Sequence, residues 1–288
     1  MSSIRSIRST VQSVALATTC AFALSGPAIA QDKLVAGVDG TFAPHAMPKL
    51  GGGVEGFNID MIEAIGKKIG QPIEVFAGEF SGLIPGMNAG KISFVGAPTT
   101  VTPERAKSLL FTEGYLNTYY QFVVPAGKPD VTTLDQLKGM TISVNKGSAY
   151  DKWGQTNKEK YGFEIAAFPT NADAVQALIS GRADAHISGN TVAAYSVTKA
   201  KDKMKLATLV VDDGRVWGAA FRKEDAALRN QVEEAIECLK QDGTLSALSE
   251  KWFGVKPTAE QAQNKVFPGY GVPGMDGYDP TPSKANCS

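Results

Sequence analysis

The stretch ISFVGAPTTVTPER, residues 92–105, joins an apolar run to a polar turn that ends in an arginine. The run Ile92–Ala97 predicts a buried strand. Thr102 is a good helix N-cap and Pro103 suits the first helical position, so a helix is expected to begin directly after the strand. Arg105 then lies in the first turn of that helix, where the helix dipole disfavours a cation.

This arrangement has two interpretations. The hydroxyls of Thr99 and Thr100, free backbone N–H groups and the Arg105 guanidinium together could hold a carboxylate or a phosphate. The alternative is an ordinary helix cap followed by a surface arginine. The stretch alone leaves both open.

The first thirty residues predict a secretory signal peptide. Arg5 and Arg8 form a basic start, Val11–Leu24 is a short apolar region, and Ala28-Ile29-Ala30 is a cleavage site. The apolar region is too short for a membrane span. We therefore expect a soluble exported protein that begins near Gln31.

Charge and composition exclude several classes of protein. The chain has 29 basic and 29 acidic residues, and the leader carries two arginines and no acid, which leaves a net charge of −2. This near-neutral balance, without a basic run, argues against a nucleic-acid partner. Two isolated histidines and no cysteine pair at ligand spacing argue against a metal site, and no cofactor is expected.

Two cysteines, Cys238 and Cys287, follow the leader. In an oxidising compartment a disulfide between them is favoured. The alternative is one buried helical cysteine and one free thiol in the tail.

Strands and helices alternate along the first third of the chain. The expected elements are strands at 33–38, 72–76 and 92–97, a helix at 57–70, and a helix capped by Ser81 and ended by Gly90. This alternation predicts a parallel sheet with helices on both faces. Ligands bind outside the carboxyl ends of such strands, where Asp39, Phe42, Phe80 and residues 99–105 lie.

The alternation restarts with a strand at 119–124. Thr133 and Gln136 have capping-box spacing, and Gly147-Ser148 opens a helix with Asp151 at the reciprocal position. A last strand at 217–221 and two helices follow. They are too few for a third domain, so we expect them to pack with the first domain. The predicted lobes are 31–118 plus 217–254 and 119–216, with a two-crossing hinge and a cleft. Residues 255–288 form an extended tail, draped on the body or disordered.

Short motifs along most of the mature chain show a resemblance to a known protein family. They include GVDGTFAP at 37–44, GFNID at 56–60, GLIPGM at 82–87, TVTPER at 100–105, KGS at 146–148, ALISGRADA at 177–185, DGTL at 242–245 and KWFG at 251–254. In this order they resemble the periplasmic solute-binding proteins of polar amino-acid ABC importers, the bacterial extracellular solute-binding proteins of family 3.

The resemblance implies a type II periplasmic binding protein fold, α/β in class, with two doubly wound α/β lobes joined by a two-crossing hinge. It implies a monomer without catalytic activity that captures a small carboxylated ligand, an amino acid or a derivative, and delivers it to a membrane permease.

The family's ligand contacts fall on particular positions of this chain. Phe42 and Phe80 resemble the aromatic pair that clasps the ligand side chain, with core packing as the alternative. Arg105 corresponds to the arginine that holds the α-carboxylate, and Ser148 would reach the ligand from the second lobe. The full expected set is Asp39, Phe42, Phe80, Thr99, Thr100, Arg105, Asn145, Ser148, Asn190 and Trp217.

Two positions depart from the family pattern. Pro98, where many members have glycine or serine, has no N–H to donate. Gly189 and Asn190, with an alignment ambiguous by one residue, stand where the family has the acid that grips the α-ammonium. The ligand is then an N-substituted, opine-like, cyclic or betaine-like solute, or an ordinary polar amino acid whose cation meets Asp39 or Glu79. Asn190→Asp is expected to favour simple α-amino acids.

Two other classes share this fold. An exported dehydratase similar to cyclohexadienyl dehydratase would need an acid or a histidine in the cleft. His186 is expected to pack inside a strand, and His45 lies on the first loop. The third class is a periplasmic sensor domain, but an importer component is favoured because the sequence shows no membrane segment or signalling module.

Overall fold

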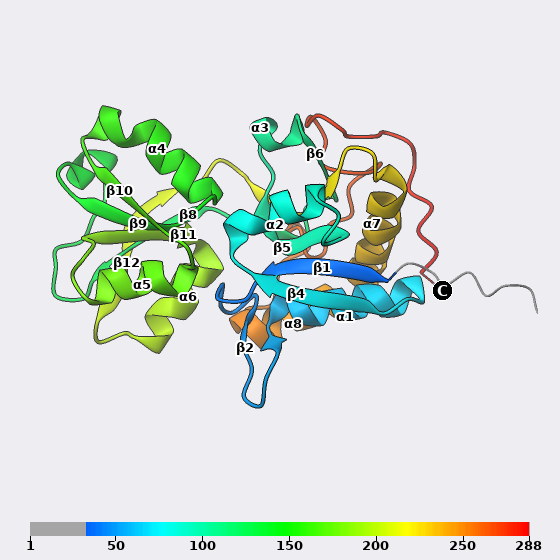
Figure 1. Ribbon diagram of the computed structural model, residues 1–288, viewed down its shortest axis with the longest axis horizontal. Coiled ribbons are helices and arrows are strands. Elements are labelled where there is room, and N and C mark those ends of the chain that lie inside the picture. The colour runs from blue at the N-terminus through cyan, green and yellow to red at the C-terminus, as the bar shows by residue number, and fades with distance from the viewer. Residues whose placement is uncertain (1–32, 288) are drawn as a thin grey trace, which may run out of the picture. The chain divides into compact units, whose positions relative to one another are not determined.

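The computed structural model describes residues 33–287, so the signal peptide predicted at 1–30 lies outside the described residues. The described chain forms one compact unit built on two larger sheets (Figure 1). The first sheet has the order β4-β1-β5-β13-β6, with β7 also paired to β13. Its strands are β1 (Leu34–Asp39), β4 (Ile73–Gly78), β5 (Phe94–Thr100), β6 (Leu109–Phe111), β7 (Leu116–Asn117) and β13 (Val216–Arg222).

The second sheet has the order β10-β9-β11-β8-β12. A small hairpin, β2–β3, extends from the first loop (Figure 1). The strands are β8 (Tyr120–Pro125), β9 (Thr141–Asn145), β10 (Glu164–Phe168), β11 (Ala185–Gly189) and β12 (Met204–Val211), with β2 (Met47–Pro48) and β3 (Val54–Glu55) in the hairpin.

Helices cover both sheets. The first sheet packs against α1 (Phe57–Ile69), α2 (Phe80–Asn88) and α7 (Ala226–Gln241), with α8 (Thr244–Phe253) against α1 and α7. The second sheet packs against α4 (Ala149–Tyr161), α5 (Asn171–Ile179) and α6 (Asn190–Lys199). The one-turn helix α3 (Pro103–Ala106) precedes β6, and the 3₁₀ turn η1 spans Leu134–Leu137.

The parallel sheet predicted from the first three strands is confirmed, but each sheet also contains antiparallel strands that the alternation did not predict. β1, β4 and β5 are parallel, whereas β13 runs antiparallel to β5, β6 and β7. β8 likewise runs antiparallel to β11 and β12. The chain enters the second sheet through β8 and returns to the first through β13. β8 follows β7 of the first sheet and β13 follows β12 of the second, with no helix between, so neither strand takes the parallel direction that a crossover helix imposes.

Local helix signals are confirmed at three of the four predicted starts. Thr102 caps α3, Thr133 forms the capping box with Gln136, and the Ser148 side chain caps α4. The start predicted at Ser81 is wrong, because α2 begins at Phe80 with Glu79 in the N-cap position. The short strand β6 was not predicted, since three residues are too few to show a period.

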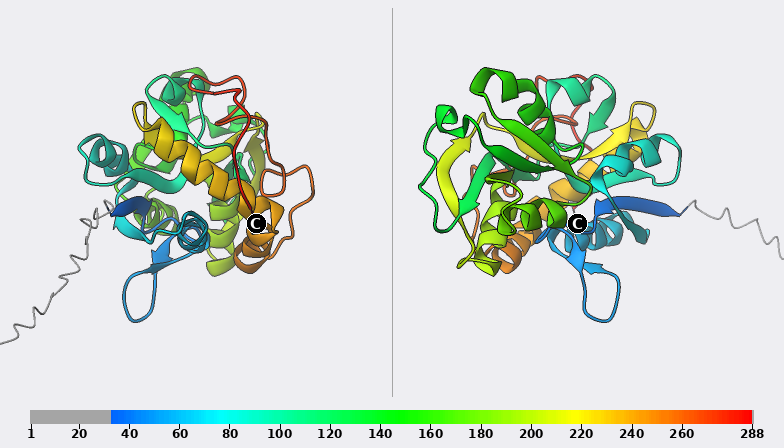
Figure 2. Two further views of the ribbon diagram at one scale, coloured as in Figure 1. Left: turned by 90° about the vertical axis from the view of Figure 1, so that its right-hand side faces the viewer. Right: turned by 60° about the vertical axis from the view of Figure 1, so that its left-hand side comes forward.

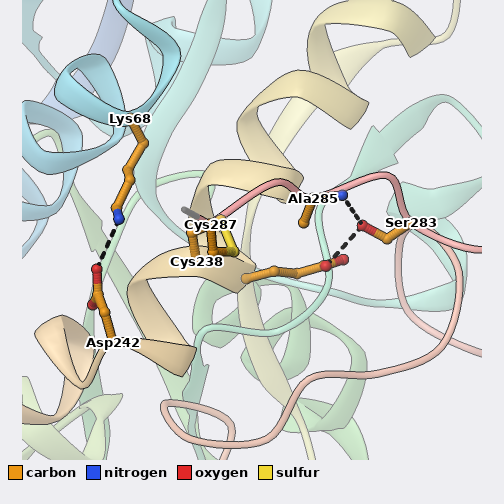
Figure 3. The surroundings of a disulfide bond; sticks show 7 residues. Lys68, Cys238, Asp242, Ser283, Ala285 and Cys287 are labelled. Carbon is orange, nitrogen blue, oxygen red and sulfur yellow. Dashed lines mark hydrogen bonds and ion pairs between the residues drawn. A yellow bond between two sulfur atoms is a disulfide. The ribbon is translucent and has the colours of Figure 1, made fainter.

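The tail after α8 runs along α7 (Figure 2). Gly271 donates its backbone N–H to both carboxylate oxygens of Glu233, at 2.7 and 2.9 Å. At the end of the tail Cys287 forms a disulfide with Cys238 on α7, and Ser283 donates a hydrogen bond to Glu237 (Figure 3). The tail is therefore draped on the body through polar contacts and one covalent bond.

Candidate ligand-binding site

A small cavity lies between the carboxyl ends of the first sheet and the start of α4. Its volume is about 10 Å³, room for about one water molecule. It is lined by seven of the ten predicted binding residues together with Ala97, Pro98, Ala149 and Tyr150. The seven are Asp39, Phe42, Phe80, Thr100, Arg105, Asn145 and Ser148.

The first sheet contributes lining residues at or just after the ends of adjacent strands. Asp39 ends β1 and Thr100 ends β5, and these two strands are parallel neighbours. Phe42 follows in the loop after β1, and Phe80 is the first residue of α2. Both rings are buried. Strand ends that meet at one edge thus bring together residues far apart in sequence.

Asp39 is a buried carboxylate that contacts the second sheet. Asn145, at the end of β9, donates from Nδ2 to Asp39 Oδ2 at 2.6 Å. Thr41 donates its N–H and its hydroxyl to the other oxygen. Burial raises the pKa of Asp39, and these hydrogen bonds lower it in part. A cation beside this carboxylate would compensate for the hydration that the carboxylate loses on burial.

Arg105 reaches from the first sheet to the second. Its Nη1 donates to the Thr100 carbonyl at 3.0 Å, and its Nη2 donates to the Gly147 carbonyl at 3.2 Å. The guanidinium carbon lies 5.6 Å from the centre of the Phe80 ring. Burial lowers the pKa of Arg105, but an arginine stays charged at neutral pH because its usual pKa is above 12. The cation is therefore fixed at the junction of the two sheets.

Ser148, the N-cap of α4, and Tyr150, in its first turn, complete the cavity from the side of the second sheet. Ser148 caps the helix by accepting the Asp151 N–H at 3.1 Å, which leaves its hydroxyl hydrogen available to a ligand. Tyr150 is buried, and burial raises the pKa of its phenol. Sequence reasoning missed Tyr150, although its place in the first turn after Gly147-Ser148 puts it beside the cap.

Three predicted residues do not line this cavity. Thr99 is buried and donates to the Ala97 carbonyl. Trp217 lies behind Thr100 and donates from Nε1 to its hydroxyl oxygen at 3.1 Å. Asn190 lines a separate, larger cavity of about 430 Å³.

Gly189, not Asn190, faces the indole of Trp217. A Cβ added to Gly189 would lie 2.6 Å from Cη2 of Trp217 and 2.8 Å from the hydroxyl of Tyr150. A carboxylate side chain therefore does not fit at residue 189 while the indole occupies this position. Among the residues that line the small cavity, Asp39 is the one carboxylate.

Both histidines are buried and neutral. With Nδ1 protonated, His45 donates to Asn58 Oδ1 at 2.9 Å and accepts from the Thr191 hydroxyl at 2.8 Å. Burial lowers the pKa of His45 to about 3 and that of His186 to about 4. Neither lines the small cavity. Within residues 33–287 there is no cluster of histidine, cysteine or acidic side chains that could hold a metal ion.

The helices of residues 33–287 are all too short or too polar to cross a membrane.

Comparison with known proteins identifies the family of this chain. A profile of the bacterial extracellular solute-binding proteins, family 3, matches residues 34–255. The probable amino-acid-binding protein YxeM of Bacillus subtilis (strain 168) is 32% identical over 227 residues, which is 78% of this chain and 85% of YxeM.

Two solved structures are also similar. An ancestral arginine-binding protein bound to arginine is 33% identical with a TM-score of 0.73, over 78% of this chain and 99% of the other. The ancestral amino acid-binding protein AncCDT-1, a precursor of cyclohexadienyl dehydratase, is 32% identical with a TM-score of 0.68, over 77% and 95%. The type II periplasmic binding protein fold is thereby confirmed, and this chain belongs to the bacterial extracellular solute-binding proteins of family 3.

Proposed function

We propose that this protein captures a polar amino acid, or a derivative that is N-substituted, opine-like or cyclic, in the cavity around Arg105. Two lobes, 31–118 plus 217–254 and 119–216, close over the ligand in the periplasm. The closed protein then delivers the solute to the permease of an ABC importer. It acts as a monomer and performs no chemistry on the ligand.

One observation carries this proposal. The Arg105 guanidinium donates to a carbonyl of β5 and to one in the turn before α4, at a cavity lined by three aromatic rings and one carboxylate. A ligand carboxylate can replace these carbonyls as a bidentate acceptor, and charge-assisted hydrogen bonds are stronger than neutral ones. The cavity holds about one water, so the lobes must separate before a ligand enters.

The position of the ligand cation follows from the same residues. Trp217 and Tyr150 occupy the space beside Gly189 where an acid would stand. Asp39 is buried between Thr41 and Asn145, and a ligand cation would offset the burial that raises its pKa. The amine of the ligand therefore lies toward Asp39. This supports amino-acid derivatives whose nitrogen is substituted, or whose cation lies away from the carboxylate.

A thermal-shift screen tests the proposal, because a ligand that binds only the folded state raises the melting temperature. The screen should include the common amino acids, opines, cyclic imino acids and betaines. We expect a saturable shift with at least one of these compounds. The absence of any shift across all four groups would contradict an amino-acid or derivative ligand.

The enzymatic alternative has a direct test. AncCDT-1 is described as a precursor of cyclohexadienyl dehydratase, so prephenate and arogenate are the substrates to try. Neither histidine lines the cavity, and a histidine with a pKa near 3 or 4 is a poor general base at neutral pH. The one carboxylate there, Asp39, already accepts hydrogen bonds from Thr41 and Asn145. We expect no turnover of either compound, and turnover would replace the transport proposal.

A further inference from the structure

A second cavity of about 430 Å³ lies between α6, α8 and the beginning of the tail. We propose that it is a binding site for a neutral polyhydroxyl compound of monosaccharide or disaccharide size. Its volume lies within the range of about 300–1,000 Å³ typical of small-molecule sites. It shares no lining residue with the small cavity around Arg105, so the proposal goes beyond amino-acid capture.

The lining selects an uncharged ligand. None of its side chains is acidic, basic or a histidine. A charged ligand would lose hydration there without meeting an opposite charge, which is costly. The rings of Tyr119, Tyr195, Trp252 and Phe253 provide broad apolar faces for the C–H face of a sugar ring. Trp252 is held in place, because its Nε1 donates to Asp60 at 2.7 Å.

The same lining offers hydrogen-bond acceptors. Asn190 and Gln263 both line the cavity, and each has a buried side-chain oxygen without a hydrogen-bond partner. Gln263 is more than nine-tenths buried. Buried amide oxygens are normally satisfied, so both would gain from a donor that the described residues do not supply, once the amide turns toward the cavity. Hydroxyl groups are such donors, and they carry no charge.

One wall is built by a segment beyond the family match. The profile ends at residue 255, whereas Pro257, Gln261 and Gln263 line the cavity. This segment is tied to the body: the Ala262 N–H donates to Asn117 Oδ1 at 2.8 Å, and Lys240 Nζ donates to the Lys265 carbonyl at 2.8 Å. A wall that is already ordered lowers the cost of binding.

Occupancy of this cavity should affect the small cavity as well. α6 packs against the second sheet, whereas α8 packs against α1 of the first. A compound that touches both helices binds best at one relative position of the two sheets. Binding there is thermodynamically coupled to binding in the cavity around Arg105, which also lies between the sheets.

The test is isothermal titration of the full mature protein with glucose, sucrose and N-acetylglucosamine. Ala194 is exposed on α6 and lines the cavity, so Ala194→Trp fills it with little expected effect on folding. Ala172→Trp, at an exposed position of α5 outside the cavity, is the matched control. Gln263→Ala removes one of the unpaired acceptors without filling the space.

We expect saturable binding of at least one probe to the unaltered protein and to Ala172→Trp. Ala194→Trp should weaken this binding at least about tenfold, and Gln263→Ala should weaken it as well. Arg105→Ala should leave it detectable, which separates this site from the proposed amino-acid site. No saturable binding of any probe up to about 10 mM, or equal affinity in Ala194→Trp, would overturn the proposal.

Discussion

The indole of Trp217 covers Gly189 so closely that an added Cβ would lie 2.6 Å from its Cη2 atom. The indole is fixed in this place by a hydrogen bond from Nε1 to the Thr100 hydroxyl oxygen at 3.1 Å. Trp217 is fully buried and therefore has little room to move. Only glycine fits at residue 189 while Trp217 holds this position. Residue 189 therefore contributes no charged side chain to the site.

Gly189→Ala should lower the free energy of unfolding by about 1–3 kcal/mol, because the methyl group overpacks against Trp217. Chemical denaturation measures this change. Gly82→Ala is the control: Gly82 lies in α2 and an added Cβ meets nothing within 4 Å. That variant should be neutral or more stable by up to about 1 kcal/mol. Equal stabilities of the two variants would contradict the packing of Trp217 over residue 189.

Asn190→Asp should leave the ligand preference of the protein unchanged, because Asn190 lines the larger cavity and not the one around Arg105. This differs from the expectation drawn from the sequence, in which the new acid favours simple α-amino acids. Titration of both proteins with the same amino acids decides between them. A gain in affinity for α-amino acids of about tenfold or more would return residue 190 to the ligand site.

His45 should make the protein less stable in acid. Its pKa is about 3 in the folded state and about 6.5 when unfolded. The unfolded state therefore takes up the proton first, and stability present above pH 6.5 is lost as the pH falls toward 3. Urea denaturation from about pH 6 to about pH 4 should show a slope about 1.4 kcal/mol per pH unit smaller in His45→Gln than in the unaltered protein.

His186→Gln provides a comparison for this measurement. Burial also lowers the pKa of His186, to about 4, so its replacement should reduce the slope over the upper part of the same range. Identical slopes in the unaltered protein and both variants would show that neither histidine is buried in its neutral form.

Removal of the Cys238–Cys287 disulfide by Cys287→Ser should destabilise the protein. The two cysteines are 49 residues apart, and closing a loop of this length corresponds to about 4 kcal/mol in the chain-entropy model. We expect a loss of about 2–4 kcal/mol, measured by urea denaturation under oxidising conditions. The unaltered protein in a reducing agent should match the variant. An unchanged midpoint in both experiments would argue against a stabilising role for the bond.

Much of the fold could be predicted because its signals are local. The cap at Thr102 and the proline at 103 act within one turn, and they place Arg105 after β5 as expected. Strand direction is not encoded by periodicity, so the antiparallel courses of β8 and β13 were missed. The path of the tail was left open for a related reason, since contacts such as Gly271 with Glu233 join residues 38 apart.

The candidate site shows where sequence reasoning reaches its limit. Side chains along a strand alternate between its two faces, so an uncertainty of one residue moves a side chain to another cavity. Gly189 ends β11 and faces Trp217, whereas Asn190 begins α6 and lines the larger cavity. Tyr150 carried no motif of its own, and only the three-dimensional arrangement brings it beside Trp217 and Gly189.

The central claim is that Arg105 holds the carboxylate of the ligand. Its most direct test is calorimetric titration of Arg105→Ala with the compound that gives the largest thermal shift, and with the carboxamide of that compound. Arg182→Ala, an exposed arginine on the second sheet's side, is the control. Arg105→Ala should lose about 2–5 kcal/mol of binding free energy and no longer distinguish acid from amide, whereas Arg182→Ala should bind normally. Full affinity for the acid in Arg105→Ala would contradict the claim.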